Sequence, residues 1–168
     1  LAAANVAYPS ISCTLAMGIM VGTCGSPVVA HKMGAVYREE ARRDFGFLAL
    51  VAVCIGLAVC LAGALFAGPL ARLLGASDLL LDDTVTYLRV QLCFAPMAML
   101  QLLFESFFVT AGRPGLGLGL ATAAGVTNAV LDYLYMGPMQ MGILGAALGT
   151  VTGYSIPAVA GGLFFLPR

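Results

Sequence analysis

The stretch FGFLALVAVCIGLAVCLAGALFAGPLA, residues 45–71, contains no charged side chain and decides the fold class. The segments 1–30, 90–104, 114–131 and 133–167 are also free of charge. Uncharged apolar runs of about 18 or more residues are typical of helices that span a lipid bilayer. The sequence therefore predicts an all-α integral membrane protein.

The composition supports the same interpretation and excludes other classes of protein. Of the 168 residues, 61% are hydrophobic and 10% are charged, whereas soluble domains carry about a quarter charged residues. Eight basic and eight acidic residues cancel, so no excess charge indicates a nucleic-acid partner. The five cysteines lie in apolar runs, and the chain has one histidine. Neither a disulfide framework, nor a metal centre, nor a bound cofactor is therefore expected.

Five spans can be placed, at about residues 5–29, 46–71, 85–110, 116–136 and 141–166. Basic side chains gather in the segment 31–44, at Arg113 and at Arg168. The charged residues of the segment 73–83 are all acidic. Lys and Arg gather in cytoplasmic loops. The three basic regions are therefore expected inside the cell, and the segment 73–83 and the turn near residue 138 outside.

This topology places Leu1 outside the cell, so we expect that an earlier helix carried the chain there. The chain begins without Met and without the pattern of a signal peptide. The natural count is then six helices, of which residues 1–168 contain five. The expected surroundings are a lipid bilayer that the protein crosses several times.

Small residues and prolines recur inside the predicted spans. Gly145, Gly149 and Gly153 follow one another at a spacing of four residues, which places them on one face of a helix. Such stripes let helix backbones approach closely in lipid, so helix packing is the simplest role for this one. Pro157 lies in the middle of the last span. A proline at such a position either produces a plain kink or marks a bend or break of the kind that transporters use to change access.

Asp132 is the only charged residue between Arg113 and Arg168. Asn128 precedes it by one helical turn and lies on the same face. A carboxylate in hydrocarbon is unfavourable by about 2.5–3.5 kcal/mol on insertion scales, so it normally faces a cavity or a partner. The pair therefore predicts either a proton or Na⁺ site or a hydrogen bond between helices.

Two further ionisable residues lie inside the spans. Arg89 is about one turn into its helix, where a long side chain can reach the membrane interface. Glu105 lies deeper in the same span. It could pair with a cation or line a cavity, and the residues alone leave both roles open.

Several stretches resemble the multidrug and toxic compound extrusion (MATE) transporters, over essentially the whole chain. They are VGTCGSPVVAHKMGAVYREEARRDF, RLLGASDLLLDDTVTYLRV, FFVTAGRPGLGL and AAGVTNAVLDYLYMGPMQMGILGAALGTV. The last is the most specific. Many prokaryotic members have an Asn-x-x-x-Asp pair on the fifth helix, followed by a Gly-Ala-Ala-rich sixth helix with a Thr. The matching residues here are Asn128, Asp132, Ala146 and Thr150.

The resemblance implies a transporter of twelve helices in two six-helix lobes in a bacterial cytoplasmic membrane, of which residues 1–168 would be a partial N-terminal transmembrane lobe, helices two to six. It implies a secondary active antiporter that exports cationic lipophilic drugs in exchange for Na⁺ or H⁺. Its site residues would be Asp132, Asn128, Thr150 and Ala146; Glu105 is no part of the family motif and stays a possible polar residue of a cavity on its chemistry alone. Its partners would include the rest of the same chain, because the family's site also uses an acid on the first helix. FVTAGRP stands where the family often has L-R-A-x-G, which puts a cation pathway there in doubt.

Two other functions were weighed against drug export. The segment REEARRD is similar to the E-E-x-x-x-R signature of intramembrane proteases, but Asp44 stands where the Arg is required, and His31 is the only histidine of the two needed. We therefore expect no enzyme activity. A lipid-linked oligosaccharide flippase of the same superfamily would need several cations along its cavity, and the spans offer almost none.

Overall fold

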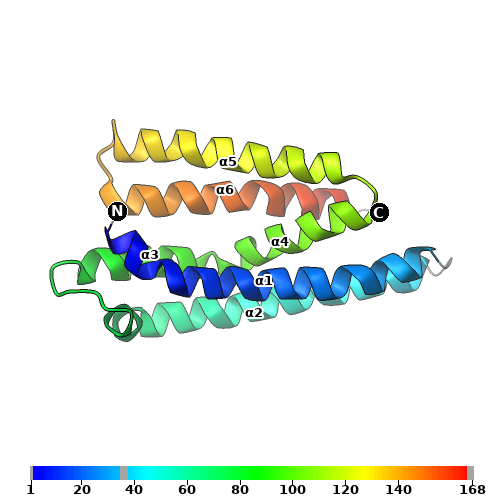
Figure 1. Cartoon of the computed structure of the whole chain (residues 1–168), viewed down its shortest axis with the longest axis horizontal. Coiled ribbons are helices and arrows are strands. Elements are labelled where there is room, and N and C mark those ends of the chain that lie inside the picture. Colours follow the sequence, from blue (N-terminus) through cyan, green and yellow to red (C-terminus); the bar gives the residue numbers. More distant parts are fainter. Residues whose placement is uncertain (1, 35–37, 166–168) are drawn as a thin grey trace.

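The computed structural model describes residues 2–34 and 38–165, and all regular structure in these residues is helical. The helices, in chain order, are α1 (Ala2–Gly34), α2 (Arg38–Leu73), α3 (Leu81–Cys93), α4 (Ala95–Thr110), α5 (Pro114–Met136) and α6 (Gly142–Phe165). They run roughly along one common direction (Figure 1). The predicted all-α class is confirmed.

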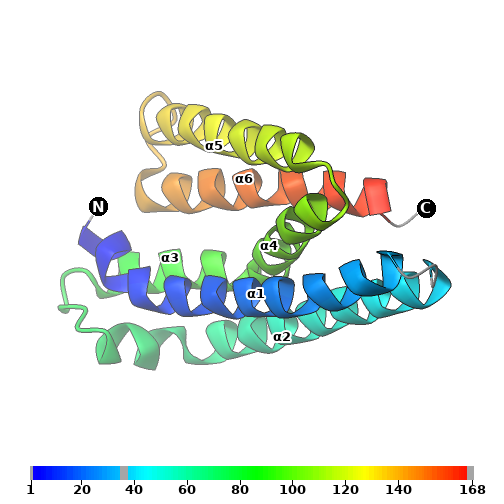
Figure 2. The same cartoon turned by 45° about the vertical axis from the view of Figure 1, so that its right-hand side comes forward.

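The turns alternate between the two ends of the bundle. The α2–α3 and α5–α6 turns lie at the end where the chain begins, and the α4–α5 turn lies at the other (Figures 1 and 2). Four of the helices are long and apolar enough to cross a membrane, and α3 with α4 makes a fifth span if the two are taken together. The basic segment 38–43 and Arg113 thus share one end, which we call the inner end. Arg168 lies outside the described residues.

The predicted span 85–110 is two helices instead of one. α3 and α4 meet at Phe94 and are bent by 51°. Pro96 occupies the first turn of α4, where its missing N–H is tolerated, whereas in a continuous helix its ring would clash with the carbonyl of Leu92. Pro96 therefore accounts for the break at Phe94. Of the two roles left open for Pro157, a break is excluded, because α6 runs through this buried proline without interruption.

Glycines of α2 bring that helix onto the α3–α4 break. A Cβ atom added at Gly56 would collide with the backbone of Pro96, and one added at Gly63 would collide with Leu92. The absence of these side chains lets α2 approach the bent pair closely, as small residues do in membrane bundles. Leu92 also belongs to the buried cluster at that end, with Ala71 and Leu88.

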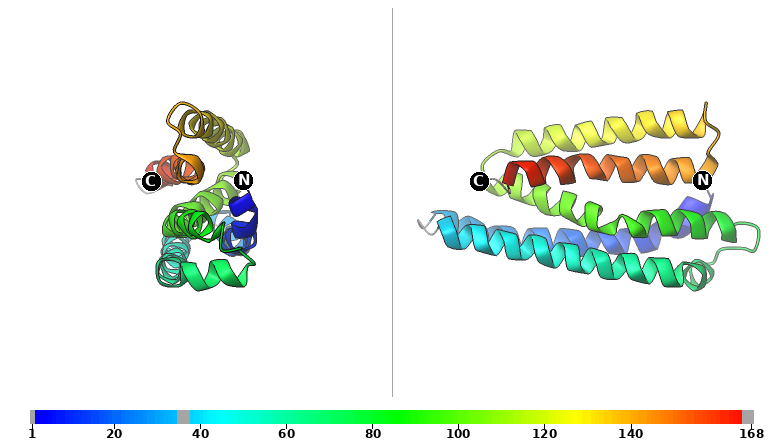
Figure 3. Two further views of the ribbon diagram at one scale, coloured as in Figure 1. Left: turned by 90° about the vertical axis from the view of Figure 1, so that its left-hand side faces the viewer. Right: turned by 180° about the vertical axis from the view of Figure 1, so that it is seen from behind.

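The helices form a four-helix body, α1 to α4, and a hairpin of α5 and α6 attached to it. α6 packs on α3 and α4, whereas α5 packs mainly on α6 and less on α4. The end-on view shows α5 at the edge of the bundle (Figure 3). Only Gly117 and Ala124 of α5 are buried. The polar residues of α5 that carry the family resemblance therefore lie against a single neighbour, α6.

Candidate functional site

The α5–α6 interface places Asp132 and Asn128 directly on the glycine stripe of α6. A Cβ atom added at Gly149 would collide with Oδ1 of Asp132. One added at Gly153 would lie 3.2 Å from the Cβ atom of Asn128 and 3.2 Å from the Ala124 carbonyl oxygen. The stripe therefore does allow close packing, as predicted, and the side chains that it admits are those of the candidate site.

The Asp132 carboxylate is held there without a hydrogen-bond partner for its buried oxygen. Within the described part of the chain, Oδ1 of Asp132 is buried and accepts no hydrogen bond. Asn128 lies one turn away and is half-buried, but no hydrogen bond joins the two side chains. An unsatisfied buried acceptor is unfavourable by about 1–3 kcal/mol, and by more when it is charged. Such an atom needs a proton, a cation or a donor from another segment.

Thr150 and Ala146 lie beside this pair on α6. The Thr150 hydroxyl donates a hydrogen bond to the Ala146 carbonyl oxygen, 3.0 Å away. Both residues are half-buried, and Thr150 directly follows Gly149, which faces Asp132. Asp132 and Asn128 thus both contact the glycine stripe of α6. Thr150 and Ala146 lie beside the stripe and are hydrogen-bonded to each other. The lone pairs of the Thr150 oxygen stay available to a cation.

The donor set fits a small hard cation or a proton. Carboxylate, amide, hydroxyl and carbonyl oxygens are the ligands that hard cations prefer. Among the described residues there is no group of three or more His, Cys, Asp and Glu side chains that could hold a transition metal. Asp132 would carry the negative charge, and Asn128 and Thr150 neutral oxygens. The same carboxylate could instead take up a proton.

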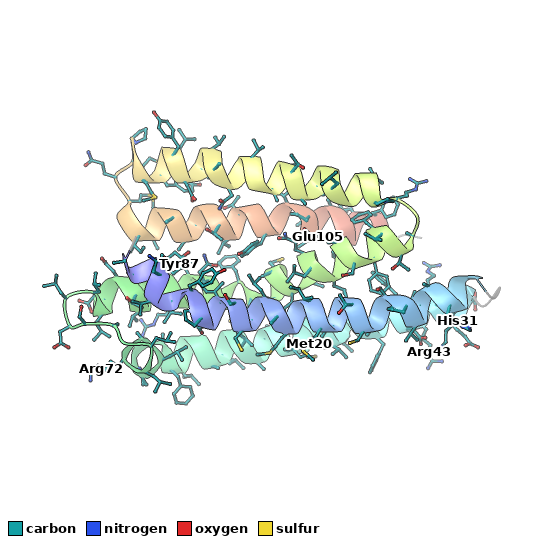
Figure 4. The ribbon with its side chains drawn as sticks, viewed as in Figure 1. Met20, His31, Arg43, Arg72, Tyr87 and Glu105 are labelled. Atoms are coloured by element: carbon teal, nitrogen blue, oxygen red, sulfur yellow. The ribbon has the colours of Figure 1, made fainter. Side chains whose placement is uncertain are left out.

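Glu105 is separate from this pair and has its own partner. Its Oε1 accepts a hydrogen bond from Nε2 of Gln101, 3.0 Å away and one turn earlier on α4. Oε1 of Gln101 is buried and accepts no hydrogen bond in the described residues. Glu105 is half-buried, and Figure 4 labels its position. Gln101 was not among the predicted site residues, although it is an amide four residues before an intramembrane acid, the same spacing that pointed to Asn128.

A second polar cluster between α1, α3 and α6 was also missed. Thr14 and Gln91 are buried, and with Tyr154 they line a cavity of about 10 Å³. That volume is about the minimum that holds one water molecule. Nε2 of Gln91 makes no hydrogen bond within the described chain. The signal that could have found this cluster is the polar side chain of Gln91 in the mostly apolar run 90–104.

Comparisons with known proteins agree with this arrangement. The MatE family profile matches residues 1–134, which include Asn128 and Asp132. The chain belongs to the MatE family. The resemblance noted in the sequence is thereby confirmed, and with it a multi-pass membrane protein. Ala146 and Thr150 lie beyond the matched residues.

Curated relatives and solved structures of the MatE family extend over more of the chain. It is 27% identical over 167 residues to the multidrug export protein MepA of Staphylococcus aureus (strain MRSA252), covering 99% of this chain and 36% of the relative. The MepA protein of Staphylococcus haemolyticus (strain JCSC1435) is 25% identical, with coverage of 99% and 36%. The chain therefore spans little more than a third of the length of these relatives.

Two solved structures share the fold at low sequence identity. One is the inward-facing conformation of a multidrug resistance MATE family transporter of the MOP superfamily, with a TM-score of 0.92, 20% identity, and coverage of 98% of this chain and 37% of that one. An outward-facing conformation of such a transporter gives a TM-score of 0.86 at 22% identity, with coverage of 98% and 36%. These likenesses concern the fold of α1 to α6.

Proposed function

We propose that this chain is part of a secondary active multidrug exporter and supplies its ion-coupling site. The observation that carries the proposal is the buried, unpartnered Oδ1 of Asp132 between α5 and α6. Membership of the MatE family and similarity to multidrug export proteins support the transport reaction. In this proposal the chain works as one lobe together with further helices of the same protein.

Coupling arises because Asp132 can be neutralised. The charged carboxylate of Asp132 packs on Gly149 at the α5–α6 interface. Its charge is poorly compensated there, because its buried oxygen has no hydrogen-bond partner in the described residues. Uptake of H⁺ or Na⁺ by Asp132 removes that charge, with Asn128 and Thr150 as neutral oxygen ligands in the Na⁺ case. Asp132 lies about one turn from the outer end of α5, so it can be loaded from outside the cell.

The substrates follow from the sign of the charges. A cationic drug bound near Asp132 is stabilised by the charged carboxylate and loses that interaction when Asp132 is neutralised. Ion uptake from outside would therefore favour release of a cationic lipophilic drug. By linkage, binding of the drug lowers the affinity for the ion by the same factor.

Transport by the full-length protein tests the proposal. In proteoliposomes with an imposed Na⁺ or proton gradient, the wild type should export a cationic dye, and Asp132→Asn should lower export to background. Asp78→Asn is the matched control, because it removes an exposed carboxylate in the α2–α3 turn, and it should leave export unchanged. Gradient-driven export by Asp132→Asn at the wild-type rate would contradict the assignment. Comparing the two gradients identifies the ion.

A further inference from the structure

The inner end holds a cavity that neither Asp132 nor Asn128 lines. It has a volume of about 580 Å³ and lies between α1, α2, α4, the α4–α5 turn and α6. Two guanidinium groups and four phenylalanine rings line it: Arg42, Arg113, Phe45, Phe107, Phe164 and Phe165. We call it the inner-end cavity. Its volume is in the range of roughly 300–1,000 Å³ that ligand pockets have.

An apolar groove continues from this cavity toward the middle of the bundle. It has a volume of about 480 Å³ and shares Arg42, Phe45 and Phe165 with the inner-end cavity. Gly46 and Val53 line its α2 side, and a Cβ atom added at Gly46 would meet no other atom within 4 Å. Together, the inner-end cavity is lined by basic and aromatic side chains, and the groove that continues from it is mainly apolar.

The positive charge at the mouth is not neutralised by nearby acids. Among the described residues that line the cavity there is no Asp or Glu. Two of the three acids of α2, Glu40 and Asp44, form ion pairs with Lys32 of α1. The third, Glu39, is exposed and does not line the cavity. The Arg113 guanidinium lies 5.7 Å from the centre of the Phe164 ring. One cation on α2 and one in the α4–α5 turn therefore flank the same cavity, and neither is paired with an acid of the described chain.

We propose that the inner-end cavity and its groove bind an anionic phospholipid from the cytoplasmic leaflet. The phosphate lies between Arg42 and Arg113, where bidentate guanidinium contacts suit it. One acyl chain lies in the groove beside Gly46. Basic pockets between transmembrane helices on the cytoplasmic side bind lipid head groups, and here the arginines, the aromatic rings and the groove follow one another in the order of a lipid's own parts. The proposal needs only the membrane location and not the transport reaction.

Lipid binding by the full-length protein tests this site. Purified protein in detergent would be titrated with phosphatidylglycerol or phosphatidylcholine, and bound lipid counted by native mass spectrometry. The wild type should prefer phosphatidylglycerol. Arg42→Gln and Arg113→Gln should each weaken phosphatidylglycerol binding about fivefold, as expected for one basic residue at a membrane surface, and the double variant more. Arg43→Gln removes the same charge from the next residue, at the edge of the α1–α2 pair away from α5 and α6 (Figure 4), and should have no effect.

A second variant distinguishes a lipid from a free phosphate. Gly46→Leu fills the groove but leaves both arginines in place, so it should weaken phosphatidylglycerol binding and leave displacement by inorganic phosphate unchanged. The proposal is overturned if the protein binds both lipids equally, if Arg43→Gln weakens binding as much as Arg42→Gln, or if Gly46→Leu has no effect. The last outcome would mean a phosphate site without an acyl chain. Exclusion of all lipid would mean that another segment of the protein covers the cavity.

Discussion

Two intramembrane carboxylates are each preceded four residues earlier by an amide, and the structure treats the two pairs differently. Gln101 donates to Glu105 within α4 at 3.0 Å. Asn128 makes no hydrogen bond to Asp132 on α5, and Oδ1 of Asp132 is buried without a partner in the described residues. Asn and Asp are each one methylene shorter than Gln and Glu, so the second pair cannot reach across one turn as easily. The longer pair is satisfied by its own helix, and the shorter one is open to a ligand.

The largest effect is expected from closing the space that Asp132 occupies. Gly149→Val places a branched side chain on the Asp132 carboxylate, so α5 and α6 must separate or the carboxylate must move. Overpacking of this kind destabilises by about 1–3 kcal/mol, and we expect ion-driven export near background. Both thermal stability and export from proteoliposomes would be measured.

Gly125→Val on α5 is the control for the Gly149 variant. A Cβ atom at Gly125 meets nothing within 4 Å, so the same change in helix propensity should leave export intact. Normal export by Gly149→Val would mean that the tight packing around Asp132 is not needed for coupling.

An intermediate effect is expected if the open pair is made to resemble the closed one. Asn128→Gln lengthens the amide by one methylene, so that it can donate to Asp132 as Gln101 does to Glu105. A hydrogen bond to a charged group contributes about 1.5–3 kcal/mol, so the apparent affinity for the coupling ion should fall about tenfold or more. The dependence of export on Na⁺ concentration or on pH would measure this shift.

Asn5→Gln is the matched control, because it makes the same change at an exposed position of α1. It should leave the ion dependence unchanged. Equal ion dependence in Asn128→Gln and the wild type would show that the length of the amide is not what keeps Asp132 free.

The smallest effect is expected from opening the closed pair. Gln101→Leu removes the donor to Glu105 and also removes the buried, unpartnered Oε1 of Gln101. The two changes partly offset each other, so we expect a loss of about 1 kcal/mol in stability and unchanged ion dependence. A double-mutant cycle with Glu105→Gln measures the coupling between the two side chains. A changed ion dependence in Gln101→Leu would place Glu105 in the coupling site.

The sequence predicted the class of fold and the candidate pair for different reasons. Charge-free runs are long-range features of composition, so they predicted helices that coincide with α1, α2, α5 and α6. The break at Phe94 was missed because a proline near the middle of a run is compatible with a kink, a break or a helix start. Which of these three forms occurs depends on tertiary packing, here on the α2 glycines that lie against Leu92 and Pro96.

The candidate site was predictable only as far as one helix extends. Asn128 and Asp132 follow from spacing on α5, but their position on Gly149 and Gly153 is a property of how α5 meets α6. The cluster of Thr14, Gln91 and Tyr154 likewise depends on side-chain geometry across α1, α3 and α6. No periodicity encodes such contacts.

The break between α3 and α4 has a consequence for how the protein enters the membrane during synthesis. α3 has 13 residues and α4 has 16, which correspond to lengths of about 20 and 24 Å, whereas the hydrocarbon layer is about 30 Å thick. Neither helix can cross alone, and α3 also carries Asp82, Asp83 and Arg89. The translocation machinery can therefore release this segment into lipid only after Pro96 and the apolar turns of α4 have emerged from the ribosome. α3 is committed to the membrane by the helix that follows it.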